Sequence, residues 1–322
     1  AGMTRAYAAF ERLEVKDKTK RVEYLRVLAN ISLQLQENDK AIEYATEVAI
    51  HALTDDDRGF AYNALGLAYH DKGEYDKAIG YYGKALAIRL KTLGSEHPDV
   101  VGTSYNNIGE SYRKKGEYDK SIGYYEKALS IFLKALGAEH VLVGTSYNNI
   151  GSAYDAKGEY DKASGYYEKA LSVYLRTLGP EHTNVGTSYN NIGSAYRNKG
   201  EYDKAIGYYE KALAISIKVL GGEHPSVGLS YNNIGESYRN KGEYDKSIVY
   251  HDKALAIRLK EHGTEHPDVG QTYHNIGAAF AQKGDKTKAM AYLLKAKAIY
   301  LKKLGAEHPH TKMVQSWIGK LK

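Results

Sequence analysis

Apolar residues recur every three or four positions in residues 101–115 and again in residues 118–136, which is the spacing of one helix face. The apolar positions of the first segment are Tyr105, Ile108 and Tyr112, and those of the second are Ile122, Tyr125, Leu129 and Leu133. Gly116 lies between the two segments and Gly137 follows the second, and Gly commonly ends a helix. The pattern therefore predicts two antiparallel helices joined by a tight turn.

This helix pair returns along the chain at a fixed period. Its Gly-Glu-Tyr sequence begins at Gly73, Gly116, Gly158, Gly200 and Gly242, with a degraded copy at Gly284, so the steps are 43, 42, 42, 42 and 42 residues. Self-similarity at a period of this length indicates a repeat architecture, in which each unit buries its apolar face against the next. We therefore expect an all-α stack of helix pairs rather than ordinary globular domains.

The repeats divide the chain into four parts. Residues 59–308 hold six units, which begin at Gly59, Gly102, Gly144, Gly186, Gly228 and Gly270. We expect residues 21–58 to form an irregular N-terminal capping repeat and residues 309–322 to form a C-terminal capping helix, on which Met313 and Trp317 would cover the last unit. Residues 1–20 are interpreted as a cloning scar, Ala1-Gly2, followed by a helical extension.

Two sets of glycines lie inside the predicted helices, where each Gly costs roughly 1 kcal/mol relative to Ala. The first helices carry Gly109, Gly151, Gly193, Gly235 and Gly277, and the second helices carry Gly80, Gly123, Gly165 and Gly207. A cost that is repeated at one register indicates a close approach between helices. We predict such an approach at both sets.

The repeat resembles the tetratricopeptide repeat. The family's aromatic–Leu–Gly–Tyr pattern and its small–aromatic–Ala positions match Tyr105, Ile108, Gly109 and Tyr112, then Ser121, Tyr125 and Ala128. The closing Pro of the family is absent, and a longer second helix accounts for 42 residues where the common repeat has about 34. The Leu-Gly-x-Glu-His-Pro loop and the Asn-Asn pair make residues 21–308 similar to kinesin light chain repeats. The near-identity of the units fits both recent duplication and a consensus design.

The resemblance implies a right-handed superhelical solenoid whose concave groove is lined by positions 2, 5, 6, 9, 12 and 13 of each first helix. Position 6 carries Asn107, Asn149, Asn191, Asn233 and Asn275, position 5 carries Asn106, Asn148, Asn190 and Asn232, and position 12 carries Arg113, Arg197 and Arg239. An Asn amide can pair with the backbone of an extended peptide, and Arg favours carboxylates. The alternative is that one Asn of each pair bonds a neighbouring loop or helix end.

Several repeated motifs have a structural interpretation. The Glu-His pairs, from Glu96-His97 to Glu307-His308, offer one His and one Glu in each loop, which is too few ligands for zinc, so we expect helix caps and no metal. The Tyr-Tyr pairs, such as Tyr124-Tyr125, place one ring in the core and one at the neighbouring interface. Asp55-Asp56-Asp57 lacks the spacing of a calcium loop and is expected to cap a helix.

We therefore predict a non-enzymatic scaffold that binds an extended, acidic peptide of a partner protein and needs no cofactor. The sequence has no nucleotide-binding or nucleophile motif and no Cys. Self-association through matching ends is the second hypothesis. Nucleic-acid binding is the third and weakest, because the net charge of +6 is mild and most Lys residues have acidic neighbours. No apolar run is long enough for a membrane span, and a cytoplasmic location is expected.

Overall fold

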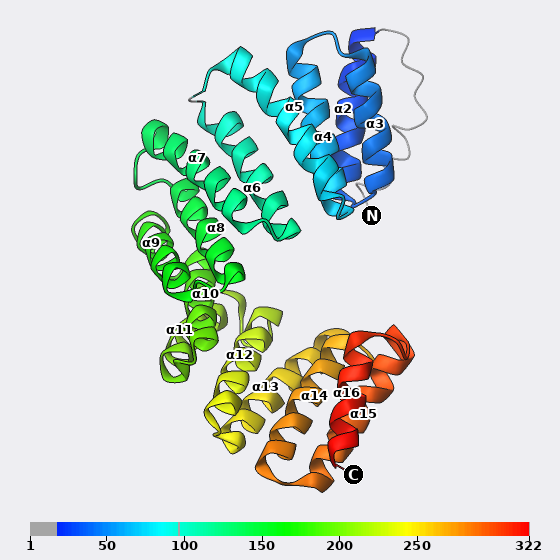
Figure 1. Ribbon diagram of the computed structural model, residues 1–322, viewed down its shortest axis with the longest axis vertical. Coiled ribbons are helices and arrows are strands. Elements are labelled where there is room, and N and C mark those ends of the chain that lie inside the picture. The colour runs from blue at the N-terminus through cyan, green and yellow to red at the C-terminus, as the bar shows by residue number, and fades with distance from the viewer. Residues whose placement is uncertain (1–17, 96, 322) are drawn as a thin grey trace. The chain divides into compact units, whose positions relative to one another are not determined.

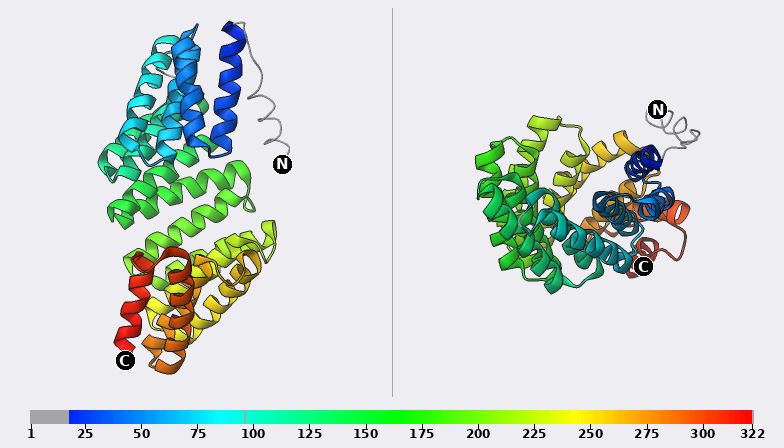
Figure 2. Two further views of the ribbon diagram at one scale, coloured as in Figure 1. Left: turned by 90° about the vertical axis from the view of Figure 1, so that its right-hand side faces the viewer. Right: turned by 90° about the horizontal axis from the view of Figure 1, so that it is seen from above.

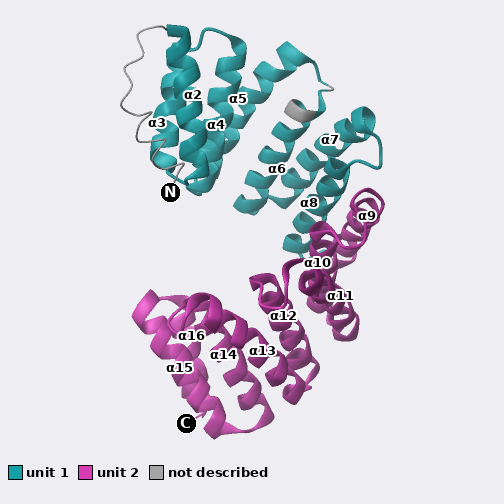
Figure 3. Ribbon diagram, turned by 180° about the vertical axis from the view of Figure 1, so that it is seen from behind, with its two compact units in different colours: residues 1–159 teal, residues 160–322 magenta. Residues whose placement is uncertain are grey.

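The structure is a computed structural model that describes residues 18–95 and 97–321, and every regular element in these ranges is a helix (Figure 1). The expected N-terminal extension lies largely outside the described residues. The chain divides into two compact units, residues 1–159 and residues 160–322 (Figure 3). No described helix combines the length and the apolar character that a membrane span requires.

Unit 1 contains seven α-helices and one short π-helix within its described residues. These are α2 (Lys18–Gln34), α3 (Asn38–His51), α4 (Asp55–Asp71), α5 (Tyr75–Leu93), η1 (Pro98–Gly102), α6 (Thr103–Lys115), α7 (Tyr118–Leu136) and α8 (Val141–Lys157). Each helix packs on the next one along the chain, and α2 and α6 also contact α4 and α8. Unit 1 is therefore a stack of antiparallel helix pairs, as the sequence predicts.

Unit 2 contains eight α-helices and continues the same pattern. These are α9 (Tyr160–Leu178), α10 (Thr183–Lys199), α11 (Tyr202–Leu220), α12 (Pro225–Lys241), α13 (Tyr244–His262), α14 (Pro267–Lys283), α15 (Lys286–Leu304) and α16 (Pro309–Leu321). Successive helices pack side by side, and the red α15 and α16 form the C-terminal end of the stack (Figure 2).

Glycine ends the first helix of each repeat by adopting a left-handed conformation. Gly116 has φ of 84° and ψ of 8°, and its N–H donates to the Arg113 carbonyl at 3.0 Å. The Glu117 N–H donates to the Tyr112 carbonyl at 2.9 Å, so two carbonyls at the helix end are satisfied. This closure fixes the tight turn from which the second helix runs back.

The first set of helix glycines marks a close approach, as predicted. A Cβ atom on Gly109 would lie 2.8 Å from Cδ1 of Tyr125, whose ring is fully buried. Gly193 meets Tyr209, Gly235 meets His251 and Gly277 meets Leu293 in the same way. The absence of a side chain on the first helix therefore makes room for one large side chain from the second.

The prediction for the second set of glycines is wrong. A Cβ atom on Gly80, Gly123, Gly165 or Gly207 would meet nothing within 4 Å. These positions face open space on the second helix, so repetition of a glycine at one register did not indicate contact there.

The tyrosine pairs join each core to the neighbouring helix. Tyr125 is fully buried, and Tyr124 stacks on Tyr112 with ring centroids 5.4 Å apart. Lys127 covers the outer face of Tyr124, with Nζ 4.9 Å from the ring centroid. These contacts confirm that one ring of the pair lies in the core, whereas the other packs on the first helix of its own repeat rather than on the next one.

A helix cap at the start of α4 and the packing of α16 on the last repeat are both visible in the structure. Asp57 accepts hydrogen bonds from the backbone N–H and the hydroxyl of Thr54, which forms a capping box at the start of α4. At the other end, α16 buries Val314 and Ile318 against the last repeat. Trp317 packs on this cluster as predicted, but Met313 does not cover the repeat, because it points outward and is 37% exposed.

Candidate functional site

Five of the six histidines of the Glu-His loops cap the helix that follows, as predicted. The prediction fails for His97, whose buried Nδ1 has no hydrogen-bond partner among the described residues. His140 Nδ1 accepts a hydrogen bond from the Leu142 N–H at 3.2 Å at the start of α8. His182, His224, His266 and His308 accept the equivalent bond within their own loops. The caps occupy one ring nitrogen of each of these histidines.

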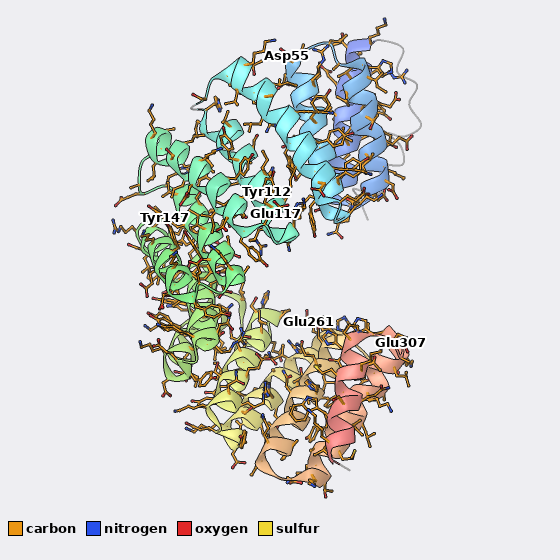
Figure 4. The ribbon with its side chains drawn as sticks, viewed as in Figure 1. Asp55, Tyr112, Glu117, Tyr147, Glu261 and Glu307 are labelled. Carbon is orange, nitrogen blue, oxygen red and sulfur yellow. The ribbon has the colours of Figure 1, made fainter. Side chains whose placement is uncertain are left out.

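Two neighbouring histidines stand at the loop after α13, whereas one was predicted in each loop. His262 stands at the end of α13, where the other five repeats have Leu, and its ring stacks on His266 with centroids 4.1 Å apart. Asp268 Oδ2 lies 3.7 Å from His262 Nε2, and Glu261, labelled in Figure 4, is adjacent. His262, His266 and Asp268 could hold a metal ion, although the cap already uses Nδ1 of His266. The sequence signal was the change from Leu to His262.

The repeated asparagines connect neighbouring first helices in unit 2. Asn233 Nδ2 donates to Asn190 Oδ1 at 2.9 Å, and Asn275 Nδ2 donates to Asn232 Oδ1 at 2.9 Å. Position 6 of one repeat therefore bonds position 5 of the repeat before it. An amide has two donors and one acceptor oxygen, so one such bond does not saturate either side chain.

The asparagines of unit 1 are arranged differently. Asn107 and Asn149 are half-buried on α6 and α8, and the structure shows no amide bond between Asn149 and Asn106. The buried Oδ1 of Asn106 has no hydrogen-bond partner among the described residues. Asn148 and Asn191 stand at positions 5 and 6 of α8 and α10.

Two of the three predicted arginines are matched by internal carboxylates. Arg113 forms a bidentate pair with Glu110, at 2.8 Å and 2.5 Å, and Glu110 also accepts the Tyr125 hydroxyl at 2.7 Å. Burial alone would raise the pKa of Glu110, but the hydrogen bonds from Arg113 and Tyr125 hold that pKa below its usual value. Arg197 reaches Glu236 of the next repeat at 2.5 Å. Both charges are therefore neutralised within the protein.

Arg239 is the exception. The residue that corresponds to Glu236 in the next repeat is Ala278, and no described carboxylate pairs with Arg239. Its Nη1 donates to Gln282 Oε1 at 3.4 Å, and its buried Nε has no hydrogen-bond partner among the described residues. A buried charged donor without a partner loses the hydration that it would have in water. The guanidinium of Arg239 is therefore not neutralised by any carboxylate of the described residues.

Two buried histidines near Arg239 also have ring nitrogens that make no hydrogen bond to the described residues. His251 is fully buried at the position that Tyr occupies in four other repeats, and neither ring nitrogen has a hydrogen-bond partner in the described part of the chain. Burial and the charges of Arg239 and Arg258 lower the pKa of His251 to about 3. Burial lowers the pKa of His274 to about 4, and its Nε2 also lacks a partner. Both rings are thus neutral at pH 7, and Arg239 supplies the charge of this site.

Family models described as the tetratricopeptide repeat match most of the chain. One matches residues 100–176, 156–218, 184–239 and 226–302, and another matches residues 61–99. No curated protein sequence matches significantly.

Solved structures match at low sequence identity. BtubC (BKLC) from P. vanneervenii is 27% identical with a TM-score of 0.60, over 72% of this chain and 93% of that chain. A Podosopora anserina protein described as a kinesin light chain with nearly identical TPR-like repeats is 26% identical with a TM-score of 0.58. The match covers 65% of this chain and 99% of that chain. A Rap protein complexed with competence and sporulation factor is 14% identical with a TM-score of 0.59, over 99% and 90%, which shows the fold alone.

Proposed function

This chain belongs to the tetratricopeptide repeat family, with repeats like those of kinesin light chains, and we propose that it is a scaffold that binds an extended, acidic segment of a partner protein. Proteins of this family generally serve as interaction scaffolds without enzymatic activity. The segment would lie across the first helices of the repeats and place a carboxylate on Arg239.

The observation that carries this proposal is the difference between Arg239 and its equivalents. Arg113 and Arg197 have Glu partners, whereas Arg239 has only a long bond to Gln282 and an unsatisfied Nε. A carboxylate from a partner would supply the missing acceptor in the planar geometry that a guanidinium prefers. It would also neutralise a charge that the fold leaves unmatched.

The asparagine ladders have a supporting role in this proposal. The bonds from Asn233 to Asn190 and from Asn275 to Asn232 hold the amides in place before a ligand arrives. The donors and acceptors that remain free on such amides can bond the N–H and C=O groups of an extended peptide backbone. This recognition does not depend on the side chains of the peptide. In unit 1 we assign the same role to Asn106, Asn107 and Asn149.

A direct test uses labelled peptides of alternating Gly and Glu and of alternating Gly and Gln, followed by fluorescence anisotropy. The acidic peptide should bind more tightly, and Arg239→Ala should weaken its binding about 10- to 100-fold, the value of a charged hydrogen bond. Lys246→Gln removes the same charge from an exposed site and serves as the control. Equal affinity of the two peptides, or no effect of Arg239→Ala, would exclude the proposed site.

A second variant tests the site without removing the arginine. Ala278→Glu introduces the carboxylate that Glu236 provides to Arg197, so it should satisfy Arg239 internally and reduce binding of the acidic peptide. Circular dichroism must confirm the fold, because Ala278 is almost fully buried. A folded Ala278→Glu variant with unchanged binding would contradict the assignment.

Self-association is the alternative function, and the C-terminal end of unit 2 disfavours it. Val314 and Ile318 of α16 already cover the last repeat, so that face is not open to another copy. Sedimentation at several concentrations decides between the two proposals. We also propose a cytoplasmic location, which the absence of Cys permits.

A further inference from the structure

Unit 2 contains a cavity of about 190 Å³ beside Ser216. Residues of α10, α11 and α12 line it, among them Gly186, Ile215, Ser226 and Ser230. An engineered apolar cavity of about 150 Å³ in another protein holds one benzene molecule. The space beside Ser216 is therefore large enough for a single aromatic ring.

The other repeats show why this space is empty. The position of Ser216 is occupied by Arg89, Phe132, Tyr174, Arg258 and Tyr300 in the other five repeats. Phe132 is fully buried, and a Cβ atom on Gly102 would lie 2.5 Å from its ring. At Gly186, the residue equivalent to Gly102, the nearest atom is Cγ2 of Ile215 at 3.4 Å. The cavity thus lies where Phe132 stands in the repeat of α6 and α7. An equivalent pocket of about 290 Å³ lies beside Arg89, between α4 and α5, where a long side chain is present.

The mouth of the cavity departs from the other repeats as well. Leu229 is 49% exposed, and four other repeats have Thr or Gln at its position. Val219 is 44% exposed at a position where other repeats have Thr, Ala, Glu or Lys. Two exposed apolar side chains therefore border the one position that has lost its bulky residue. Exposed apolar groups that gather at one place are typical of an interaction site.

The lining favours an aromatic ring over a guanidinium. Arg258 fills the equivalent space in the next repeat by donating to Thr272 Oγ1 at 2.8 Å and to the Asp268 carbonyl at 2.9 Å. Ser226 replaces Asp268 beside the cavity, and no charged side chain lines it. A guanidinium would therefore be buried without a carboxylate, whereas an aromatic ring needs none.

We infer that this cavity binds one Phe or Tyr side chain of the partner segment, an inference that rests on the proposed function. Leu229 at the mouth and Arg239 stand ten residues apart on α12, which is about 15 Å along a helix. An extended peptide covers that distance in about four to five residues. The partner segment therefore carries an aromatic residue about four to five positions from an acidic one.

The first test uses p-cresol, the side-chain analogue of Tyr, as a probe of the cavity. Isothermal titration and ¹H–¹⁵N spectra should show saturable binding of p-cresol to the wild-type chain, with shifts at residues of α10 to α12. Ser216→Tyr should reduce this binding at least 10-fold by filling the space with the chain's own ring. Ser216→Phe is a second filled variant, in case Ser216→Tyr does not fold, since Phe132 occupies the equivalent position in another repeat.

The outcomes separate this inference from the proposed function. Arg239→Ala should leave p-cresol binding unchanged, since the arginine does not line the cavity. Absence of p-cresol binding, or equal binding to the filled variants, would overturn the inference even if the acidic peptide still binds. A Gly-Glu peptide with one Tyr should bind the wild type at least 10-fold more tightly than the same peptide with Ala, and Ser216→Tyr should remove that difference.

Discussion

The repeat of α6 and α7 in unit 1 and the stretch from α10 to α13 in unit 2 share a backbone plan but differ in how they satisfy their polar groups. In the first, Arg113 is paired with Glu110 and Phe132 fills the space between helices. In the second, Arg239 has no carboxylate and Ser216 leaves a cavity. The comparison teaches that residues common to all repeats build the scaffold, whereas departures from the repeat create the candidate site.

The largest expected effect comes from changing the two equivalent positions in opposite directions. Phe132→Ala removes a fully buried ring and should lower the free energy of unfolding by about 3–5 kcal/mol. Ser216→Phe fills an existing cavity and should raise that free energy by about 0.5–2 kcal/mol. Urea unfolding of the two variants measures both changes. A large loss of stability in Ser216→Phe would mean that the space is not available.

His251 should make unit 2 sensitive to acid. The pKa of His251 is about 3 in the folded protein and near 6.5 when unfolded, so the unfolded chain binds more protons between these values. Stability is thus complete above pH 6.5 and falls as the pH drops, by about 2 kcal/mol at pH 5. Arg239, Arg258 and His274 all face this ring and none favours its protonation.

The control is His251→Tyr, which restores the residue of four other repeats. Thermal unfolding of both proteins between pH 7 and pH 5 should show a steeper loss in the wild type. An equal loss of stability with pH in the two proteins would contradict the lowered pKa of His251.

The two glycine sets should respond oppositely to alanine. Gly109→Ala forces a Cβ atom to within 2.8 Å of the Tyr125 ring and should destabilise the protein by about 1–3 kcal/mol. Gly123→Ala meets no atom within 4 Å and should stabilise the helix by about 1 kcal/mol. Thermal unfolding compares them, and two changes of the same sign would refute the distinction.

The smallest expected effect concerns the asparagine bond. Asn233→Ala removes the bond to Asn190 and should cost about 1 kcal/mol. Asn149→Ala is the matched control in unit 1, because it stands at the same position without an equivalent bond to Asn106. Chemical unfolding should show the larger loss for Asn233→Ala, and equal losses would remove the structural difference between the two units.

The sequence predicted the helix pairs because their determinants are local. Apolar spacing, the left-handed glycine at Gly116 and the five capping histidines act within a few residues, and the structure confirms each of them. The role of Gly109 was also predictable, since a mid-helix glycine is costly and needs a reason.

What the sequence did not predict depends on contacts between repeats. Gly109 and Gly123 look alike in the sequence, and only packing separates the contact from the open space. The bond from Asn233 to Asn190 joins residues in adjacent repeats, and the internal partner of Arg197 lies one repeat away. Alignment of the repeats could have identified Ser216 and His262, because both replace a bulkier or more apolar residue at their positions.

The most direct test of the account follows the side-chain Nε–H signals of the arginines by ¹H–¹⁵N spectroscopy during titration with the Gly-Glu peptide. The signal of Arg239 should shift on binding, because its Nε has no partner in the free protein. The signal of Arg113 should stay in place, because its Nε already donates to Glu110. A shift of Arg113 with no change at Arg239 would contradict the central claim that the acidic partner is held by the arginine whose internal carboxylate is missing.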